Sequence, residues 1–126
     1  MRLLNFSHPL TNSQISQVEN LTQLKIETVR DVRVQFDITQ EFVPQVVKMV
    51  EELAISSEEW QTEAWLLVLP SLNYISTILL AELHGRIGRF PTIIRLRPGA
   101  NTLVNSFEVA EIISLDGVRN AARTRR

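Results

Sequence analysis

The run Ala64–Leu69 most limits the folds that are available to this chain of 126 residues. All of its residues are apolar, so both sides of an extended segment there would be apolar, which is typical of a central strand in a parallel sheet. The run is too short to cross a bilayer, and it ends at Pro70. The sequence therefore predicts an α/β fold in which helices cover both faces of a sheet.

Segments typical of strands and helices alternate along the rest of the chain. Further strands are predicted at Arg2–Phe6, Lys25–Phe36, Thr92–Leu96 and Phe107–Leu115. Helices are predicted at Asn12–Thr22, from Val43 to Leu53, from Ser56 through Trp60, and from about Leu72 to His84. Right-handed crossovers between such units give a mostly parallel sheet. The last two strands have no helix between them and can pair antiparallel, so residues 1–126 read as a single Rossmann-like domain.

Several positions set the details of these elements. Thr11 and Gln14 form a capping-box pattern at the first helix, whose apolar side is expected to carry Ile15, Val18 and Leu21. Alternation of Val32, Val34 and Phe36 with Arg33 and Gln35 suits a half-exposed strand, with a bulge or turn at Arg30-Asp31. Gly85 and Gly88 should stop the helix that begins near Leu72, and the segment from Asp116 should be a short basic helix or a frayed end.

Composition limits the kinds of partner. There is no cysteine, which excludes disulfides, thiolate metal sites and a thiol nucleophile and fits a reducing cytoplasm. The start of the chain lacks the long apolar core of a signal peptide, so a cytoplasmic protein with no membrane partner is expected. Thirteen basic and fourteen acidic residues nearly balance, which argues against binding a long nucleic acid but permits a small anionic ligand.

Polar residues follow the predicted parallel strands, where the carboxyl ends of such strands form one rim and ligands usually bind. Arginine suits phosphate, and helix starts favour anions. The predicted ligand-binding residues are Asn5, Ser7, His8, Thr11, Gln35, Asp37, Ser71, Asn73, Arg95 and Arg97. His8 is also the candidate catalytic acid or base. Structural alternatives stay open: His8 as a turn residue, Arg95 as the partner of an acidic side chain, and Ser71 as a helix cap.

Several chemistries lack their motifs. The chain has neither a glycine-rich dinucleotide fingerprint nor a phosphate loop that ends in Gly-Lys-Ser or Gly-Lys-Thr. Two distant histidines without cysteine make zinc unexpected, and Gly-x-Ser-x-Gly is absent. No cofactor and no metal site are therefore predicted.

Distinctive segments over most of the chain resemble one small family. They are Asn5–Thr11, Val34–Asp37, Glu58–Thr62, Leu80–Arg86, Phe90–Thr92 and Ala121–Arg126. Together they are similar to the CRISPR-associated Csx-fifteen family, which accompanies type III CRISPR systems. These motifs identify relatives and are not a catalytic signature.

The resemblance implies a role in cyclic oligoadenylate signalling, through a CRISPR-associated Rossmann-like fold that binds rings of AMP across a twofold dimer interface. Some small relatives are ring nucleases, and others sequester the ring. Cyclic tetra-adenylate, with its charges and approximate twofold symmetry, would match a homodimer or a higher oligomer. The competing interpretations are an interaction subunit that docks on another CRISPR component, and an enzyme that acts on an unrelated nucleotide.

Overall fold

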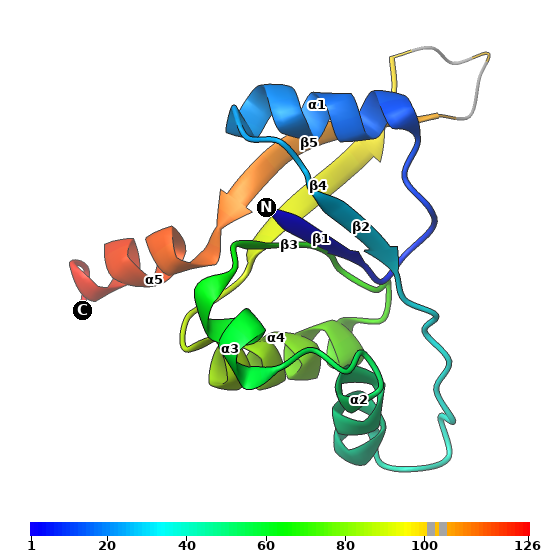
Figure 1. Ribbon diagram of the computed structural model, residues 1–126, viewed down its shortest axis with the longest axis vertical. Coiled ribbons are helices and arrows are strands. Elements are labelled where there is room, and N and C mark those ends of the chain that lie inside the picture. The colour runs from blue at the N-terminus through cyan, green and yellow to red at the C-terminus, as the bar shows by residue number, and fades with distance from the viewer. Residues whose placement is uncertain (101–102, 104–105) are drawn as a thin grey trace.

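The computed structural model describes residues 1–100, 103 and 106–126. Within them, five strands form one sheet in the order β2-β1-β3-β4-β5 (Figure 1). The strands are β1 (Arg2–Asn5), β2 (Thr28–Asp31), β3 (Trp65–Val68), β4 (Thr92–Pro98) and β5 (Phe107–Ser114). The first four are parallel, whereas β5 pairs antiparallel with β4. The predicted mostly parallel α/β sheet is confirmed, as is its antiparallel last pair.

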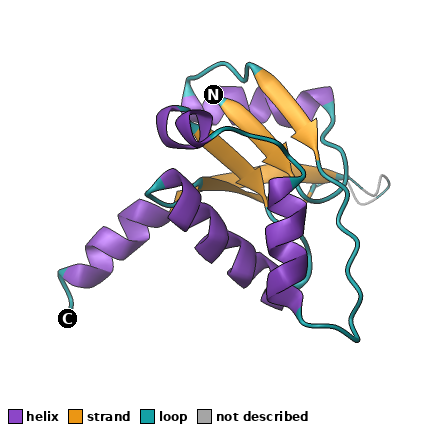
Figure 2. Cartoon of the chain, turned by 60° about the horizontal axis from the view of Figure 1, so that its bottom comes forward, coloured by secondary structure: helices purple, strands orange, loops and turns teal. Residues whose placement is uncertain are grey.

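Helices cover both faces of this sheet (Figures 1 and 2). They are α1 (Asn12–Thr22), α2 (Phe42–Glu51), α3 (Ser57–Thr62), α4 (Asn73–Ile87) and α5 (Leu115–Arg123). Helix α1 lies on one face, and α2, α3 and α4 lie on the other. The architecture is Rossmann-like. None of the described helices is both long and apolar enough to cross a membrane.

The core consists of two layers that meet in β3. Every residue of β3 is buried. Leu66 packs in a cluster with Val18 of α1, and Leu67 packs on the opposite face with Leu79 of α4. Alternate side chains of one short strand therefore enter both layers, which is why the sequence of this strand is apolar throughout.

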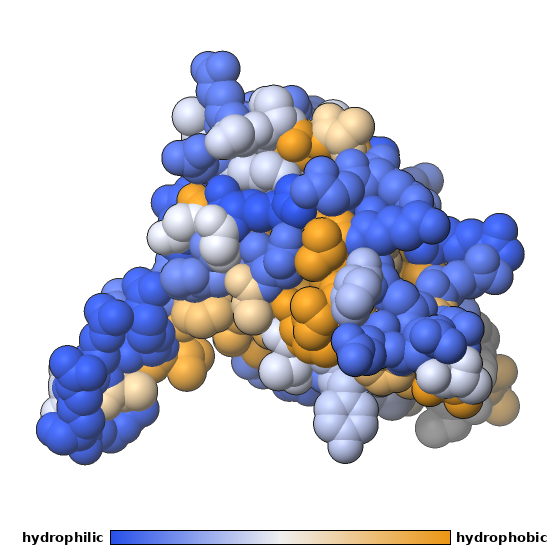
Figure 3. All heavy atoms as spheres, turned by 90° about the horizontal axis from the view of Figure 1, so that it is seen from below, coloured by the Kyte–Doolittle hydropathy of each residue, from blue (hydrophilic) through white to orange (hydrophobic). Residues whose placement is uncertain are grey.

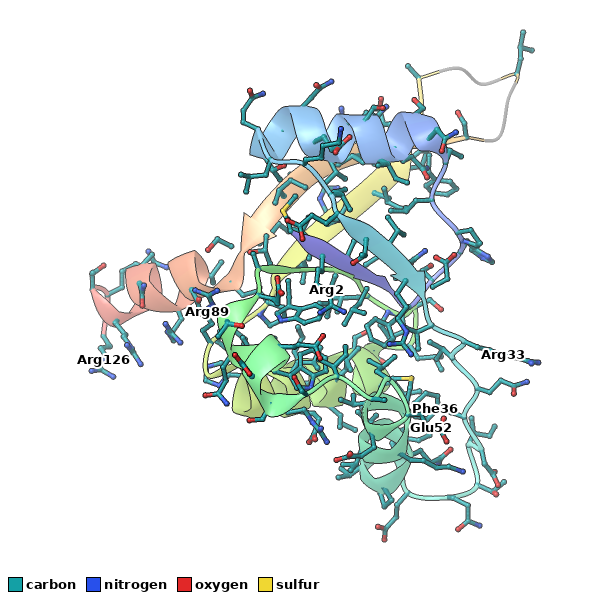
Figure 4. All side chains as sticks on the ribbon, in the orientation of Figure 1. Arg2, Arg33, Phe36, Glu52, Arg89 and Arg126 are labelled. Carbon is teal, nitrogen blue, oxygen red and sulfur yellow. The ribbon has the colours of Figure 1, made fainter. Side chains whose placement is uncertain are left out.

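The alternating segment Val32–Phe36 is not a strand, so that part of the strand prediction is wrong. Strand β2 is instead Thr28–Asp31, where the interruption was expected. Its neighbour β1 ends at Asn5. After Val32 donates its N–H to the Asn5 carbonyl, no strand of the described residues pairs with the segment. The chain stays extended, so Phe36 still packs on the core while Arg33 points outward (Figure 4).

The helix ends also differ in part from expectation. Helix α4 continues through Gly85 to Ile87 and stops only at Gly88, whose φ of 87° requires the left-handed conformation that glycine adopts easily. In α1, Leu21 is 55% exposed and Gln14 is buried, so the buried side of that helix lies about one position away from the predicted one. The segment after Ser114 is a helix, in agreement with one of the two expectations for it.

An ion pair ties the start of the chain to α3. The Arg2 guanidinium lies 2.7 Å from the Glu59 carboxylate and 4.5 Å from the ring centre of Trp65. The hydrogen bond from Arg2, followed by bonds from Ser56, lowers the pKa of Glu59 below its ordinary value of 4.5. A carboxyl with a lowered pKa stabilises the folded state above its unfolded pKa, and that stabilisation disappears as the pH falls through the folded value.

We therefore expect Glu59→Gln to reduce the loss of stability in acid. The difference in unfolding free energy between the parent and Glu59→Gln, measured by urea denaturation, should be largest near neutral pH and should shrink below about pH 4.5. Arg2→Met removes the partner of Glu59 and should weaken the dependence of the unfolding free energy on pH over the same range. A difference in unfolding free energy between parent and variant that is constant at every pH would contradict this assignment.

Candidate functional site

A cavity of about 920 Å³ lies at the carboxyl ends of the parallel strands. Its walls come from the loop after β1, the start of α1, the loop after β3, and β4 with β5. In this strand order, the connection after β1 leads to β2 on one side and the connection after β3 leads to β4 on the other, and ligands bind at such a switch point between β1 and β3. Among the predicted residues, Ser7, His8, Thr11, Ser71 and Arg95 line this cavity.

Asn5 builds the loop that carries Ser7 and His8. Its side chain is fully buried, and its Nδ2 donates to the His8 carbonyl at 2.8 Å and to the Asp31 carboxylate at 2.9 Å. Its Oδ1 accepts the Ser7 N–H at 3.0 Å. Asn5 therefore positions the loop from below, whereas the exposed Ser7 and His8 border the open cavity.

Helix α1 begins at the cavity wall. The Thr11 hydroxyl accepts the Gln14 N–H at 3.1 Å, and Gln14 Oε1 accepts the Thr11 N–H at 2.9 Å, so the predicted capping box is confirmed. The N–H groups of the first turn give this end a partial positive charge. Thr11 and Ser13 both line the cavity, which places that charge beside it.

The two predicted arginines differ in position. Arg95 lines the cavity, and its Nη2 lies 2.8 Å from Glu111 on the neighbouring strand. Arg97 lies 2.8 Å from Glu108 and is not among the residues of the cavity wall. Both form cross-strand ion pairs between exposed side chains, the structural role that was left open for Arg95. An anionic ligand would have to compete with Glu111 for Arg95.

Ser71 and Asn73 lie at the start of α4. Ser71 borders the main cavity and also a smaller hollow of about 360 Å³, which His8, Arg33 and Leu72 share. The residue before the helix is Leu72, which provides no side-chain cap, so Ser71 is not the N-cap. The Asn73 carbonyl accepts the Thr77 hydroxyl, and Asn73 belongs to neither of these two linings.

Gln35 and Asp37 lie apart from the main cavity. Gln35 lies in the segment that leaves the sheet and Asp37 follows it, and neither is among the residues that line the cavity. The hydroxyl and the N–H of Thr39 donate to the Asp37 carboxylate and lower the pKa of Asp37. The Asp37 backbone bonds the Gln45 side chain of α2. Gln35 and Asp37 were expected on the rim because a strand was predicted to extend to Phe36, and that part of the strand does not form.

The sequence did not predict that β5 forms part of the cavity wall. Gln14 Nε2 donates to the Phe107 carbonyl at 2.9 Å, and Gln17 Oε1 accepts the Val109 N–H at 2.8 Å. These bonds join α1 to β5, and Phe107 is left 52% exposed in the wall. The spacing of Gln14, Gln17 and Val18 on one helix side was the available signal. Pairing of that side with β5 depends on the tertiary structure.

No family model, curated protein or solved structure matches this chain. The cavity therefore has to be interpreted from its own chemistry. Its described lining combines hydroxyl and imidazole groups, a helix start, Arg95, the Glu108 carboxylate that pairs with Arg97, a half-exposed aromatic ring and apolar side chains. Its volume is near the upper end for small-molecule sites, which suits a ligand with anionic and aromatic parts. Among the described residues, no cluster of three or more His, Asp or Glu is arranged to hold a metal.

Proposed function

We propose that this protein binds a cyclic oligoadenylate, cyclic tetra-adenylate in particular, and lowers its free concentration in type III CRISPR signalling. The observation that carries the proposal is the 920 Å³ cavity at the switch point of the sheet, with the start of α1, Arg95 and Phe107 in its wall. The family resemblance described above supplies the identity of the ligand.

Each part of such a ligand has a counterpart in the wall. Phosphates would lie at the first turn of α1 and at Arg95. Adenine would stack on Phe107, because an exposed aromatic ring offers a face to any base. Ser7, His8 and Ser71 would bond ribose hydroxyls or the base edge. Asn5 would act by holding the loop in place.

A direct titration tests this function. Labelled cyclic tetra-adenylate should be retained by the purified protein, and linear tetra-adenylate and AMP should compete poorly. Because Arg95 and a helix dipole contribute, retention should fall as salt rises. Absence of retention by protein with a normal circular dichroism spectrum would refute the proposal.

A homodimer or larger homo-oligomer with the ring between subunits belongs to the same proposal. Two copies of one rim match the approximate twofold symmetry of the ring. Light scattering should then show at least twice the mass at saturating ligand that the same protein shows without ligand. An unchanged mass with ligand bound would contradict an arrangement in which two subunits share one ring.

His8 separates storage from turnover. Cleavage would proceed by attack of a ribose 2′-hydroxyl on its neighbouring phosphate: the new P–O2′ bond closes a 2′,3′-cyclic phosphate as the P–O5′ bond breaks. The 2′-hydroxyl proton passes to water or a base, and the leaving 5′-oxygen takes up a proton. This route mainly requires in-line positioning. We expect His8→Ala to weaken binding and to reduce any cleavage only in proportion. A single-turnover assay at saturating protein measures both quantities. A loss of cleavage of about 100-fold with unchanged binding would instead make His8 the general acid or base.

A further inference from the structure

Helix α5 projects from the body of the molecule (Figures 1 and 2). None of its nine residues, all of them described, is buried. Val118 is 55% exposed, and Ala121 and Ala122 are exposed on the same side of the helix. A helix this short is only marginally stable in water unless another surface covers its apolar side.

The charged side of α5 is the side that is attached. Asp116 accepts the Phe90 N–H at 3.0 Å, and the Arg119 guanidinium lies 3.4 Å from Asp116 and 5.8 Å from the ring centre of Phe90. In an ordinary surface helix the apolar side faces the core, so α5 has the reverse arrangement. Helix α5 and the residues after it, 115–126, are called the arm below. Figure 3 shows the arm extending from the body with hydrophobic residues at its base. A helix side that exposes apolar residues to water is expected to contact another molecule.

The distribution of charge indicates which molecule α5 contacts. Four arginines and one aspartate give residues 115–126 a charge of +3, and because the whole chain carries −1, the remaining 114 residues carry −4. Six glutamates lie between Met49 and Gly85, with Lys48 and Arg86 directly outside that segment. Arg2, Lys48 and Arg86 pair with four of these glutamates, so the six carboxylates and three cations leave the α3–α4 region a net charge of −3. The arm of one chain therefore complements the α3–α4 region of another.

The α3–α4 region also has a matching shape. A hollow of about 340 Å³ lies there, lined by Ile55, Ser57, Trp60, Gln61, Gly85, Arg86 and Gly88. The Arg86 charge is balanced by its ion pairs with Glu51 and Glu82. A Cβ added at Gly85 would meet nothing within 4 Å, so the chain's own packing does not require glycine inside α4. Glycine in a helix interior is unfavourable, and it permits close approach of another backbone. Glu58 of α3 is exposed near this hollow and can face an arginine.

We propose that α5 docks into the α3–α4 hollow of a second copy of this chain, so that two subunits exchange arms. This contact is independent of ligand binding. Strand β5 runs opposite to the parallel strands, so α5 starts at the end of the sheet away from the cavity. The arms can be exchanged while both cavities remain open.

The first experiment measures mass without ligand. Sedimentation should give twice 14.4 kDa, with a dissociation constant that rises between low salt and about 0.5 M sodium chloride. Val118→Asp on the arm and Gly85→Gln in the hollow should each raise that constant about tenfold or more. Leu21→Asp is the matched control, because Leu21 is also helical and 55% exposed, and it should leave the mass unchanged. Retention of cyclic tetra-adenylate should be the same in all three variants.

The second experiment uses the absence of native cysteine. Ala122→Cys and Gln61→Cys should give little disulfide when each is oxidised alone and a crosslinked dimer when they are mixed. Crosslinking of Ala122→Cys only with itself would show that α5 pairs with α5 and would overturn the proposal. A protein that stays monomeric at all concentrations would also overturn the proposal. This holds equally if the arginines of the arm are found to bind an oligonucleotide.

Discussion

Replacing Arg95 with alanine should weaken binding of cyclic tetra-adenylate about 10- to 100-fold. Arg95 is the arginine in the cavity wall, and a hydrogen bond to a charged group contributes about 1.5–3 kcal/mol. The partner Glu111 would be left without its arginine, which adds negative charge near the site. Isothermal titration at moderate salt measures the change.

Arg97→Ala is the matched control. It removes an ion pair of the same kind, to Glu108 at 2.8 Å, from the next outward-facing position of the same strand. Arg97 is absent from the cavity wall, but its partner Glu108 lines it, so Glu108→Gln is added to remove the carboxylate that Arg97→Ala would leave unpaired. The protein with both substitutions should change affinity by less than about threefold, as for an exposed ion pair. Equal losses in the two variants would mean that long-range charge, and not contact at the cavity, controls binding.

Asn5→Ala should destabilise the fold by about 2–4 kcal/mol and abolish binding. The substitution leaves the Ser7 N–H, the His8 carbonyl and the Asp31 carboxylate without their shared partner, and the side chain that they lose is fully buried. Urea denaturation followed by circular dichroism measures the stability. Binding should be assayed well below the denaturation midpoint, so that loop disorder is separated from unfolding.

Asn12→Ala is a suitable control for this substitution. Asn12 is an exposed asparagine at the first position of α1, close to the same loop. Its removal should change stability by less than about 0.5 kcal/mol, as at most surface positions. If Asn5→Ala were as stable as Asn12→Ala, the hydrogen bonds of Asn5 would not hold the loop.

The sequence alone was sufficient where a local pattern has one structural solution. Ala64–Leu69 contains a strand that is buried on both faces, and the Thr11–Gln14 capping box begins a helix where it was expected. These features depend on neighbours close in sequence or on burial. The fold class followed from the order of such segments, and with it the position of Ser7, His8 and Ser71 at one cavity.

Other features depended on which segments become neighbours. Val32–Phe36 has the alternation of a strand, but β1 is too short to pair with it, so Gln35 and Asp37 left the predicted rim. Arg95 and Arg97 were expected at the rim because their strand ends there. The register with β5 placed a glutamate opposite each of them, and no local pattern specifies that register.

Gln14 has a consequence for the motions of the site. Glutamate at this position could complete the capping box equally well, but it could not donate to the Phe107 carbonyl as the Gln14 amide does. One side chain thus joins the first turn of α1 to the edge strand β5 across the cavity. In native-state hydrogen exchange, we expect the Gln14 and Val109 amides to open together with similar opening free energies. In Gln14→Glu, β5 should exchange earlier than α1.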